Sequence, residues 1–219
     1  MKVFYRFGLL KINLDHSIIQ DMLEKIIHFD QDLFLLINQG LSNIVFDWLL
    51  PILRNPYTWS PLYLFLIIFF IKHYGKTGIL IVACTLATFG ISDSVSSHLI
   101  KKTVKRVRPC NDVVFKNEVN LRARCGSGFS FTSSHATNHF AMAFFWIVLF
   151  RRRWKHTLWL CLLWAISISF SQIYVGVHYP LDILCGAIIG TLIGLGTGYL
   201  FKRFYPSFFE PKNVTTTPA

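Results

Sequence analysis

Five long apolar segments, separated by short polar connectors, constrain the fold of this chain more than any other feature. They cover residues 59–71, 78–99, 135–150, 157–174 and 181–201. An α-helix needs about 20 mostly apolar residues to cross a bilayer, and hydrophobic residues make up 53% of this chain, more than in most soluble proteins. We therefore expect an all-α protein, a polytopic transmembrane helical bundle of five to six membrane helices.

The last apolar segment carries a glycine at every fourth position. These glycines are Gly186, Gly190, Gly194 and Gly198. Small residues on one helix face let a neighbouring helix approach closely within a membrane. The stripe therefore predicts tight helix packing.

The N-terminal part of the chain has a different character. Residues 1–27 carry charges throughout and lack an uninterrupted apolar stretch, so we expect an irregular or surface-lying extension and no ordinary signal peptide. Residues 29–53 are apolar with polar interruptions, which predicts one or two amphipathic interfacial helices with a break near Gly40 to Asn43. A first membrane crossing is the alternative. The interruptions are Asp30, Asp32, Asn38, Gln39 and Asp47.

These patterns divide the chain into three parts. They are an N-terminal extension with amphipathic helices over residues 1–54, a transmembrane domain over 55–203 and a C-terminal tail over 204–219. The formal net charge is +11, and the cations lie between the apolar segments. That distribution makes nucleic acid an improbable partner and favours the lipid bilayer and an anionic membrane lipid. We expect no obligatory protein partner.

The order of the segments places two polar regions on one side of the membrane. Residues 101–134 and 171–182 are separated by two crossings, so they open on the same side, whereas the connectors at 72–76 and 151–156, and the pair Lys202-Arg203, lie opposite. Each side carries eight lysines and arginines, which leaves the positive-inside rule undecided. The compact cluster at 151–155 breaks the tie, because short loops orient best. It predicts cytoplasmic connectors and an outer active face.

The cysteines fall into two groups. Cys110 and Cys125 bracket a polar loop, and in an oxidising compartment they are candidates for a disulfide; two free thiols are the alternative. Cys84, Cys161 and Cys185 lie within apolar segments and are interpreted as small buried hydrophobic residues.

The first of three polar clusters contains Lys101, Arg108 and Pro109. A lysine provides a point charge and an arginine a fork for two phosphate oxygens, so the pair fits a phosphate clamp. Pro109 is expected to end the helix. Asp93 and Lys101 share a helix face at helical spacing, so Asp93 is expected to support Lys101 through a network. A basic helix end at the membrane surface is the alternative.

The second cluster is Ser133-Ser134-His135, directly before an apolar helix. Serine is a preferred N-cap, and the free N–H groups at a helix start form an anion site. His135 adds a proton donor that titrates near neutrality. A cap without further function is the alternative.

The third cluster contains Ser171, Gln172, His178 and Asp182. His178 and Asp182 are one helical turn apart, with Pro180 at a suitable first helical position. A carboxylate on one ring nitrogen leaves the other free to attack phosphorus. The pair alone is a common pattern, but three such clusters at helix ends on one membrane face indicate a shared site.

Together the clusters resemble the signature of the type 2 phosphatidic acid phosphatase superfamily, the membrane branch related to vanadium haloperoxidases. That signature reads Lys-x6-Arg-Pro, then Pro-Ser-Gly-His, then Ser-Arg-x5-His-x3-Asp. The matching residues are Lys101, Arg108, Pro109, Ser133, His135, Ser171, His178 and Asp182. The resemblance covers about residues 55–203.

The resemblance implies a lipid phosphatase that works without a metal or another cofactor. In it, His178 would attack phosphorus and become phosphorylated, Asp182 would orient it, and His135 would protonate the leaving oxygen. The residues expected to bind phosphate are Lys101, Arg108, Ser133, Ser134 and Gln172, with Asp93 and Ser171 in support.

Three positions depart from the family pattern, which has proline, glycine and arginine where this chain has Thr132, Ser134 and Gln172. The neutral Gln172 loses a charge-assisted hydrogen bond worth about 1.5–3 kcal/mol. Candidates to supply the missing charge are Arg122, Arg124 and Lys105. We expect an active but differently tuned site; a degenerate, lipid-binding protein is the alternative.

The expected substrate is a lipid phosphate or diphosphate at the outer face of a bacterial-type inner membrane, with a polyprenyl diphosphate such as undecaprenyl diphosphate first. Phosphatidate, phosphatidylglycerol phosphate and lipid A phosphates remain open, as does a lipid phosphotransferase of the same fold. A different enzyme class would use His135, His139, His178 and Asp182 to hold a metal.

Overall fold

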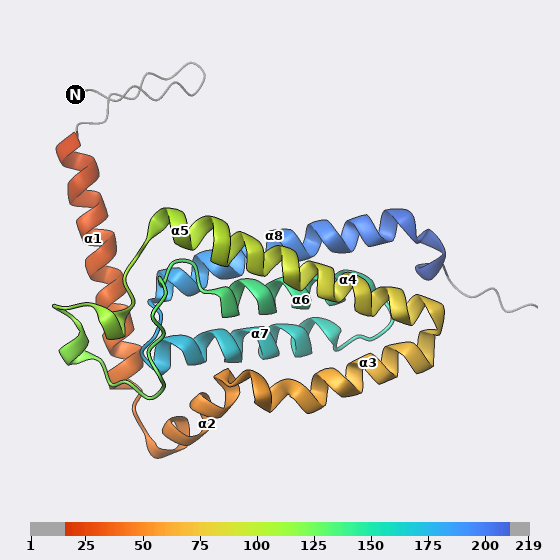
Figure 1. Ribbon diagram of the computed structural model, residues 1–219, viewed down its shortest axis with the longest axis horizontal. Coiled ribbons are helices and arrows are strands. Elements are labelled where there is room, and N and C mark those ends of the chain that lie inside the picture. The colour runs from red at the N-terminus through yellow and green to blue at the C-terminus, as the bar shows by residue number, and fades with distance from the viewer. Residues whose placement is uncertain (1–15, 211–219) are drawn as a thin grey trace, which may run out of the picture.

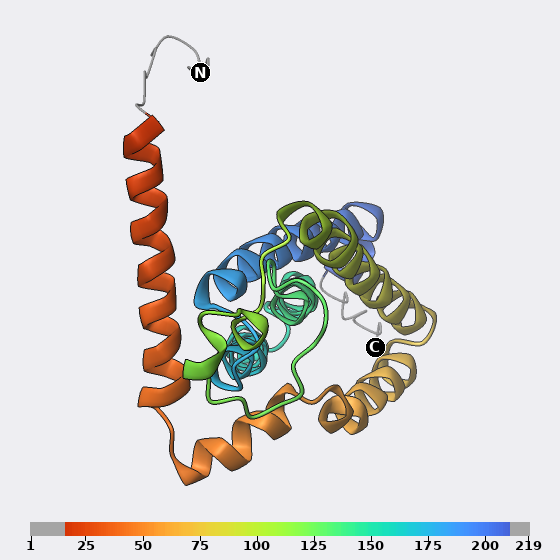
Figure 2. The same ribbon diagram turned by 60° about the vertical axis from the view of Figure 1, so that its left-hand side comes forward.

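The computed structural model describes residues 16–210, and every regular element within them is helical. Five helices run side by side along the molecule (Figure 1), which confirms the expected all-α bundle. They are α3 (Ser60–Tyr74), α4 (Lys76–Asp93), α6 (Ser134–Phe150), α7 (Thr157–Tyr174) and α8 (Pro180–Phe204). Figure 2 shows α6 surrounded by the others, and it packs against α4, α7 and α8.

Three helices within residues 16–210 are long and apolar enough to cross a membrane. They are Lys76–Val104, Thr157–Tyr174 and Pro180–Phe204. The first contains α4, a π-helical segment η3 (Ser94–Ile100) and the short α5 (Lys101–Val104). A fourth span arises if the N-terminal helix pair, bent by 115°, is one broken span. The chain is an integral membrane protein, and five to six membrane helices remain a prediction.

The glycine stripe brings α8 close to α6. A Cβ atom on Gly190 would lie 2.2 Å from the carbonyl oxygen of Thr137, and one on Gly194 would lie 2.2 Å from that of Ala141. No side chain fits at such distances, so the two backbones touch along the stripe. This contact fixes the start of α6 beside the start of α8.

The N-terminal segment forms α1 (His16–Leu35), a π-helical turn η1 (Leu36–Gly40) and α2 (Ile44–Arg54). The break falls between Gly40 and Ile44, where the side chain of Asn43 caps α2 by accepting from the backbone N–H groups of Val45 and Phe46. The N-terminal part of α1 projects away from the bundle in Figures 1 and 2, whereas its last turns contact α8 and α2 packs against α7. Residues 16–27 are helical, so the expected irregular extension is wrong there; residues 1–15 lie outside the described part.

One end of the bundle carries the long loop between α5 and α6, together with the end of α7 and the start of α8 (Figure 1). The helical span Lys76–Val104 ends where the next residue, Lys105, adopts the left-handed conformation with φ of 54°. The expectation that Pro109 ends this helix is therefore wrong, since Arg108 already lies in extended loop. Cys110 and Cys125 form a disulfide across the loop.

The other end of the bundle is closed by aromatic packing. A 3-10 turn, η6 (Pro206–Phe208), follows α8 and places Phe208 among Tyr74, Phe150 and Phe201. The boundary expected at residue 203 therefore falls within packed structure. The cysteines of the apolar segments are unpaired but only half-buried, not buried as expected. They are Cys84, Cys161 and Cys185.

Candidate active site

Hydrogen bonds at the loop end of the bundle join the three polar clusters. Arg108 of the first cluster donates from Nη1 to Nε2 of His178 at 3.1 Å. The backbone N–H of Ser133 donates to the carbonyl oxygen of Asp182 at 3.1 Å. The hydroxyl groups of Ser97 and Ser134 lie 2.9 Å apart. Residues far apart in the chain thus form one site at the ends of α5, α6, α7 and α8.

His178 accepts a hydrogen bond at one ring nitrogen and faces a carboxylate with the other. Arginine can only donate hydrogen bonds, so Nε2 of His178 accepts from Arg108 and the ring proton belongs on Nδ1. Nδ1 faces Oδ2 of Asp182 at 3.5 Å, at the outer limit for a hydrogen bond. In this tautomer Nε2 carries the lone pair. That lone pair becomes available for attack when Arg108 donates its hydrogen bond to a bound anion instead of to Nε2.

Burial keeps His178 neutral. The side chain is 2% exposed, and desolvation lowers the pKa of His178 to about 4, against the opposing effect of Asp182 and with a further lowering by Arg108. The imidazole is therefore uncharged at neutral pH. A neutral ring is the form that can act as a nucleophile.

Arg108 is fixed on the other side by backbone oxygens. It donates from Nε to the carbonyl of Gly128 at 2.8 Å and from Nη1 to that of Val177 at 3.1 Å. Two carbonyl contacts orient the guanidinium without neutralising it, so its charge remains available to an anion.

Asp182 is the meeting point of a buried ion-pair chain. Its Oδ1 accepts from Arg106 Nη1 at 2.8 Å, and its Oδ2 accepts from the backbone N–H of Tyr179 at 2.9 Å. Arg106 also donates from Nη2 to Oδ2 of Asp30 at 2.6 Å, while Oδ1 of Asp30 accepts from the N–H of Leu181 at 2.8 Å. Burial lowers the pKa of Arg106, but the two carboxylates raise it overall. The chain ties α1 to the carboxylate beside His178.

The start of α6 is organised by serine hydroxyls and Asp93. The hydroxyl of Ser133 caps the helix by accepting from the N–H of Ala136 at 3.4 Å. Asp93 accepts from Ser97 at 3.3 Å and from Asn138 at 3.0 Å. Within residues 16–210 no hydrogen bond joins Asp93 to Lys101, so the network leads to Ser134 through Ser97 instead.

Gln172 is buried with unsatisfied polar atoms. The residue is 0% exposed, and neither its Nε2 nor its Oε1 has a hydrogen-bond partner in the described part of the chain. Such a group costs about 1–3 kcal/mol. Its neighbour Ser171 is also buried and donates to the carbonyl of Ser167 at 2.6 Å, within its own helix.

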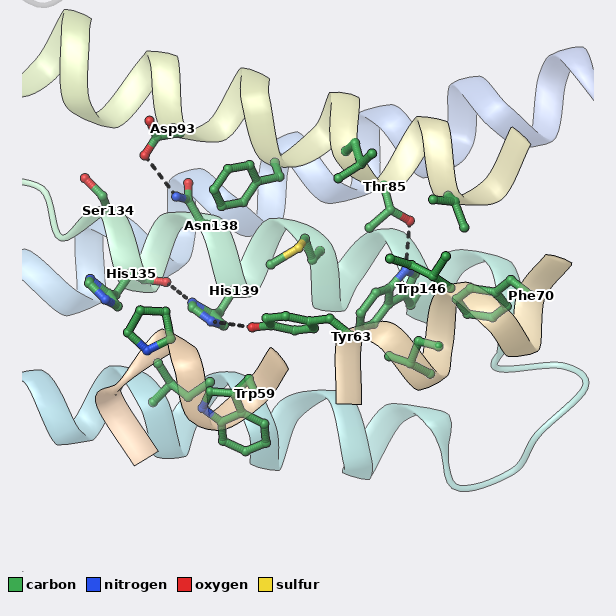
Figure 3. Close-up of a pocket in the computed structure, with 18 of the residues that line it drawn as sticks. Trp59, Tyr63, Phe70, Thr85, Asp93, Ser134, His135, Asn138, His139 and Trp146 are labelled. Atoms are coloured by element: carbon green, nitrogen blue, oxygen red, sulfur yellow. Dashed lines mark hydrogen bonds between the residues drawn. The ribbon is translucent and has the colours of Figure 1, made fainter. Parts of the chain in front are cut away.

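An apolar cavity of about 470 Å³ lies between α3, α4 and α6. Ser134 and His135 lie at one end and Phe70 at the other (Figure 3), with Tyr63 and Trp146 along it. Its volume falls in the range of small-molecule sites, roughly 300–1,000 Å³. His135 is also within electrostatic range of His178, so this end of the cavity lies beside the polar cluster.

His139 lines the same cavity and has a structural role there. Its Nδ1 donates to the backbone carbonyl of His135 at 2.7 Å, and its Nε2 lies 3.4 Å from the hydroxyl of Tyr63. Residues 16–210 contain no group of three or more histidine, cysteine, aspartate or glutamate side chains arranged for a metal ion. The geometry therefore does not gather the four residues of the alternative metal site.

Three charged residues of the site were missed by sequence reasoning, namely Asp30, Arg54 and Arg106. Asp30 was noted only as a polar interruption, although a carboxylate inside an apolar run was a signal for a buried partner. Arg122, a candidate for the missing charge, is engaged elsewhere. It contacts Asp47, donates to Ser42 at 2.7 Å and lies 4.4 Å over the ring of Tyr174.

Comparisons with known proteins agree with this geometry. The sequence model of the PAP2 superfamily matches residues 76–206. The chain is 33% identical to "Lipid A 4'-phosphatase" of Bacteroides thetaiotaomicron, over 82% of this chain and 78% of the relative. It is 30% identical to "Undecaprenyl-diphosphatase" of Sulfolobus acidocaldarius, over 88% and 89%.

Solved structures give the same result. The crystal structure of LpxE from Aquifex aeolicus is similar with a TM-score of 0.60 and 27% identity, and the match covers 76% of this chain and 92% of that one. The PAP2 type phosphatidylglycerolphosphate phosphatase from Bacillus subtilis matches with a TM-score of 0.62 over 85% and 90%; at 19% identity it supports the fold alone.

Proposed function

Because the chain belongs to the PAP2 superfamily and is a lipid phosphatase of that type, we propose that it cleaves a lipid phosphate or diphosphate through a phosphohistidine on His178, without a metal. The observation that carries this proposal is the setting of His178, whose Nε2 accepts a hydrogen bond from Arg108 and whose Nδ1 faces the Asp182 carboxylate at 3.5 Å. It presents a neutral nucleophile beside a cation that can bind the phosphoryl oxygens.

The reaction follows in two steps. In the first, Nε2 of His178 bonds to phosphorus while the bond from phosphorus to the leaving oxygen breaks, and His135 gives a proton to that oxygen. The negative charge of a bound phosphate favours the protonated form of His135 that can do this. In the second, water attacks the phosphohistidine, His135 takes a proton from the water, and inorganic phosphate leaves with the ring of His178 restored.

The phosphate oxygens have several donors within the site. Lys101 and Arg108 supply positive charge, and the first-turn N–H groups of α6, at Ser134 and His135, have no acceptor within their helix. The hydroxyls of Ser133 and Ser134 add further donors. Gln172 is the remaining candidate, because a phosphate oxygen would satisfy its amide.

The supporting residues act through these groups. Asp93 holds Ser97, which in turn positions the hydroxyl of Ser134. Ser171 fixes the last turn of α7 through its bond to Ser167. Both sets define where the phosphate donors point.

The lipid tail lies in the apolar cavity that begins at His135. A polyprenyl diphosphate is the first candidate substrate, since it carries a single hydrocarbon chain and the described residues 16–210 form a single apolar cavity beside His135. A lipid A phosphate is the second, favoured by the Bacteroides relative of 33% identity. The site faces the periplasm of an inner membrane, a placement supported by the Cys110–Cys125 disulfide, since such bonds persist in oxidising compartments.

The experiment is phosphate release by the purified protein in detergent from a panel of lipid phosphates, with and without EDTA. We expect release that EDTA does not reduce, and a 31P signal of phosphohistidine after rapid acid-free quenching. The His178→Ala variant should give neither. Activity that requires an added divalent metal would contradict the proposal.

A further inference from the structure

Arg54 is the last residue of α2 and has no role in the motifs. It is half-buried, and within residues 16–210 its guanidinium forms neither a hydrogen bond nor an ion pair. Cations that leave water without a partner are rare, because desolvation costs free energy that a counter-charge must offset. An unpaired arginine at the edge of an apolar cavity is therefore available to an anionic ligand.

The packing of α2 brings this residue to the active site. Leu53 packs against the cluster of Tyr174, Val175 and Val177, and Val177 directly precedes His178. The indole N–H of Trp59 donates to the carbonyl of Leu53 at 2.7 Å, which fixes the turn after α2. The end of α2 is thus held beside the backbone that Arg108 also contacts.

The charge of Arg54 acts on residues of both of the first two clusters. Burial lowers the pKa of Arg108, and the charge of Arg54 lowers it further, while Asp182 raises it. Arg54 is also within electrostatic range of His135. It therefore adds a cation to the same site from an element outside the family match.

The cavity shows on which side of the phosphate this cation lies. Arg54 lines the apolar cavity together with Ser134 and His135, whereas His178 and Arg108 are not among the described residues that line it. A phosphorus atom attacked by His178 lies between the two histidines, with its leaving group toward the cavity. Arg54 is then on the lipid side of the bond that breaks.

We propose that Arg54 binds the proximal phosphate of a lipid diphosphate and makes the site selective for diphosphates over monophosphates. This inference rests on the proposed function. In a diphosphate the P–O–P bridge breaks, the bridging oxygen stays with the lipid phosphate, and the leaving group carries negative charge that Arg54 stabilises. In a monoester the leaving oxygen takes a proton from His135 and becomes a neutral alcohol, which gives Arg54 no anion to bind.

A purely structural role makes a different prediction. Arginine at a helix C-terminus interacts favourably with the helix dipole, and its stem can cover apolar surface. Loss of that interaction would lower stability and would affect all substrates alike. Two substrates with the same tail therefore separate the two roles.

The test compares farnesyl diphosphate with farnesyl phosphate. For Arg54→Gln we expect kcat/KM to fall about 10- to 100-fold on the diphosphate, the size of one charged hydrogen bond, and to change less than about threefold on the monophosphate. Arg54→Lys should recover part of the loss. Arg152→Gln, which removes an exposed arginine of the connector between α6 and α7 at the opposite end of the bundle, is the matched control and should leave both rates unchanged.

The other outcomes are distinct. An equal loss on both substrates, or no loss on either, would overturn the proposal. A wild-type protein that hydrolyses neither farnesyl compound nor any lipid phosphate of the panel would instead refute the proposed function itself.

Discussion

The family-matched core and the N-terminal helices reach the active site in different ways. In the core, residues 76–206, the motif side chains contact one another and nearby backbone, as Arg108 does with His178 and Val177. The N-terminal helices contribute single charges from a distance: Asp30 from α1 and Arg54 from α2. In the proposed reaction the core therefore carries the reacting groups, while the N-terminal helices supply charges around them.

The comparison extends to how the two regions are joined. Two arginines of the long loop hold N-terminal carboxylates: Arg106 bonds Asp30 and Arg122 bonds Asp47. Only Arg106 also contacts a motif residue, Asp182. The Arg106–Asp30 ion pair thus connects the N-terminal segment to a residue of the candidate site, whereas the Arg122–Asp47 ion pair connects it only to the long loop.

The largest effect is expected from the nucleophile of the core. His178→Ala should lower phosphate release at least about 1,000-fold, as the loss of a covalent nucleophile does in other enzymes. The measurement is a phosphate assay on the purified protein together with its thermal unfolding. His156→Ala, at an exposed position of the opposite connector, is the control and should retain activity. Appreciable turnover by the His178 variant would place the chemistry elsewhere.

The next largest effect is expected from the Arg106 ion pairs that connect the two regions. Arg106→Gln leaves the buried carboxylates of Asp30 and Asp182 unpaired, so we expect about 3–5 kcal/mol of lost stability and a lower kcat even where the variant is folded. Arg122→Gln should lower stability alone, because Arg122 touches no group of the site. Thermal unfolding and kcat of both variants at a permissive temperature check this. An equal loss of kcat in both variants would contradict the distinction between the Arg106 and Arg122 ion pairs.

The pH dependence of stability follows from burial of the neutral His178. Its pKa is about 4 in the folded protein and about 6.5 when unfolded. Between these values the unfolded chain binds the additional proton, so stability falls as pH falls from 6.5 to 4, by on the order of 3 kcal/mol. Thermal unfolding of wild type and His178→Ala at pH 7 and pH 4.5 should show the smaller decrease in the variant. An identical decrease would mean that this imidazole does not titrate as its burial requires.

A smaller effect is expected from the α1 carboxylate itself. Asp30→Asn keeps a hydrogen-bond acceptor for Arg106 but removes the charge, so Arg106 shifts its pairing toward Asp182 and weakens the hold of that carboxylate on His178. We expect kcat to fall about 3- to 10-fold at unchanged KM, with a shifted acid limb of the pH profile. Asp32→Asn, at an exposed position on the same helix, is the control. If kcat is recovered in Asp30→Glu, the carboxylate acts by positioning Arg106 and not only by supporting the fold.

The bundle and its motif residues were predictable because both depend on local patterns. Apolar length predicts helices, and α7 has the bounds expected from the sequence, residues 157–174. The pairing of Arg106 with Asp30 was not predictable, because the two residues are 76 positions apart and no periodicity relates them. The end of the helix Lys76–Val104 was predicted too late, at Pro109. The helix ends earlier because Lys105 leaves the helical conformation, and the basic residues around it do not signal this turn.

The smallest effect, and the sharpest test of the core, concerns Gln172. Its amide is buried without a partner, so Gln172→Leu should raise stability by removing an unsatisfied polar group while it lowers phosphate release if the amide binds phosphate. Gln172→Arg should preserve activity or raise it up to about tenfold, because it adds a charge-assisted bond at the position where the family has arginine. Phosphate release and thermal unfolding of both variants provide the measurement. Complete inactivity of a folded Gln172→Arg protein would mean that residue 172 does not face the phosphate, and the assignment of the third cluster would have to be revised.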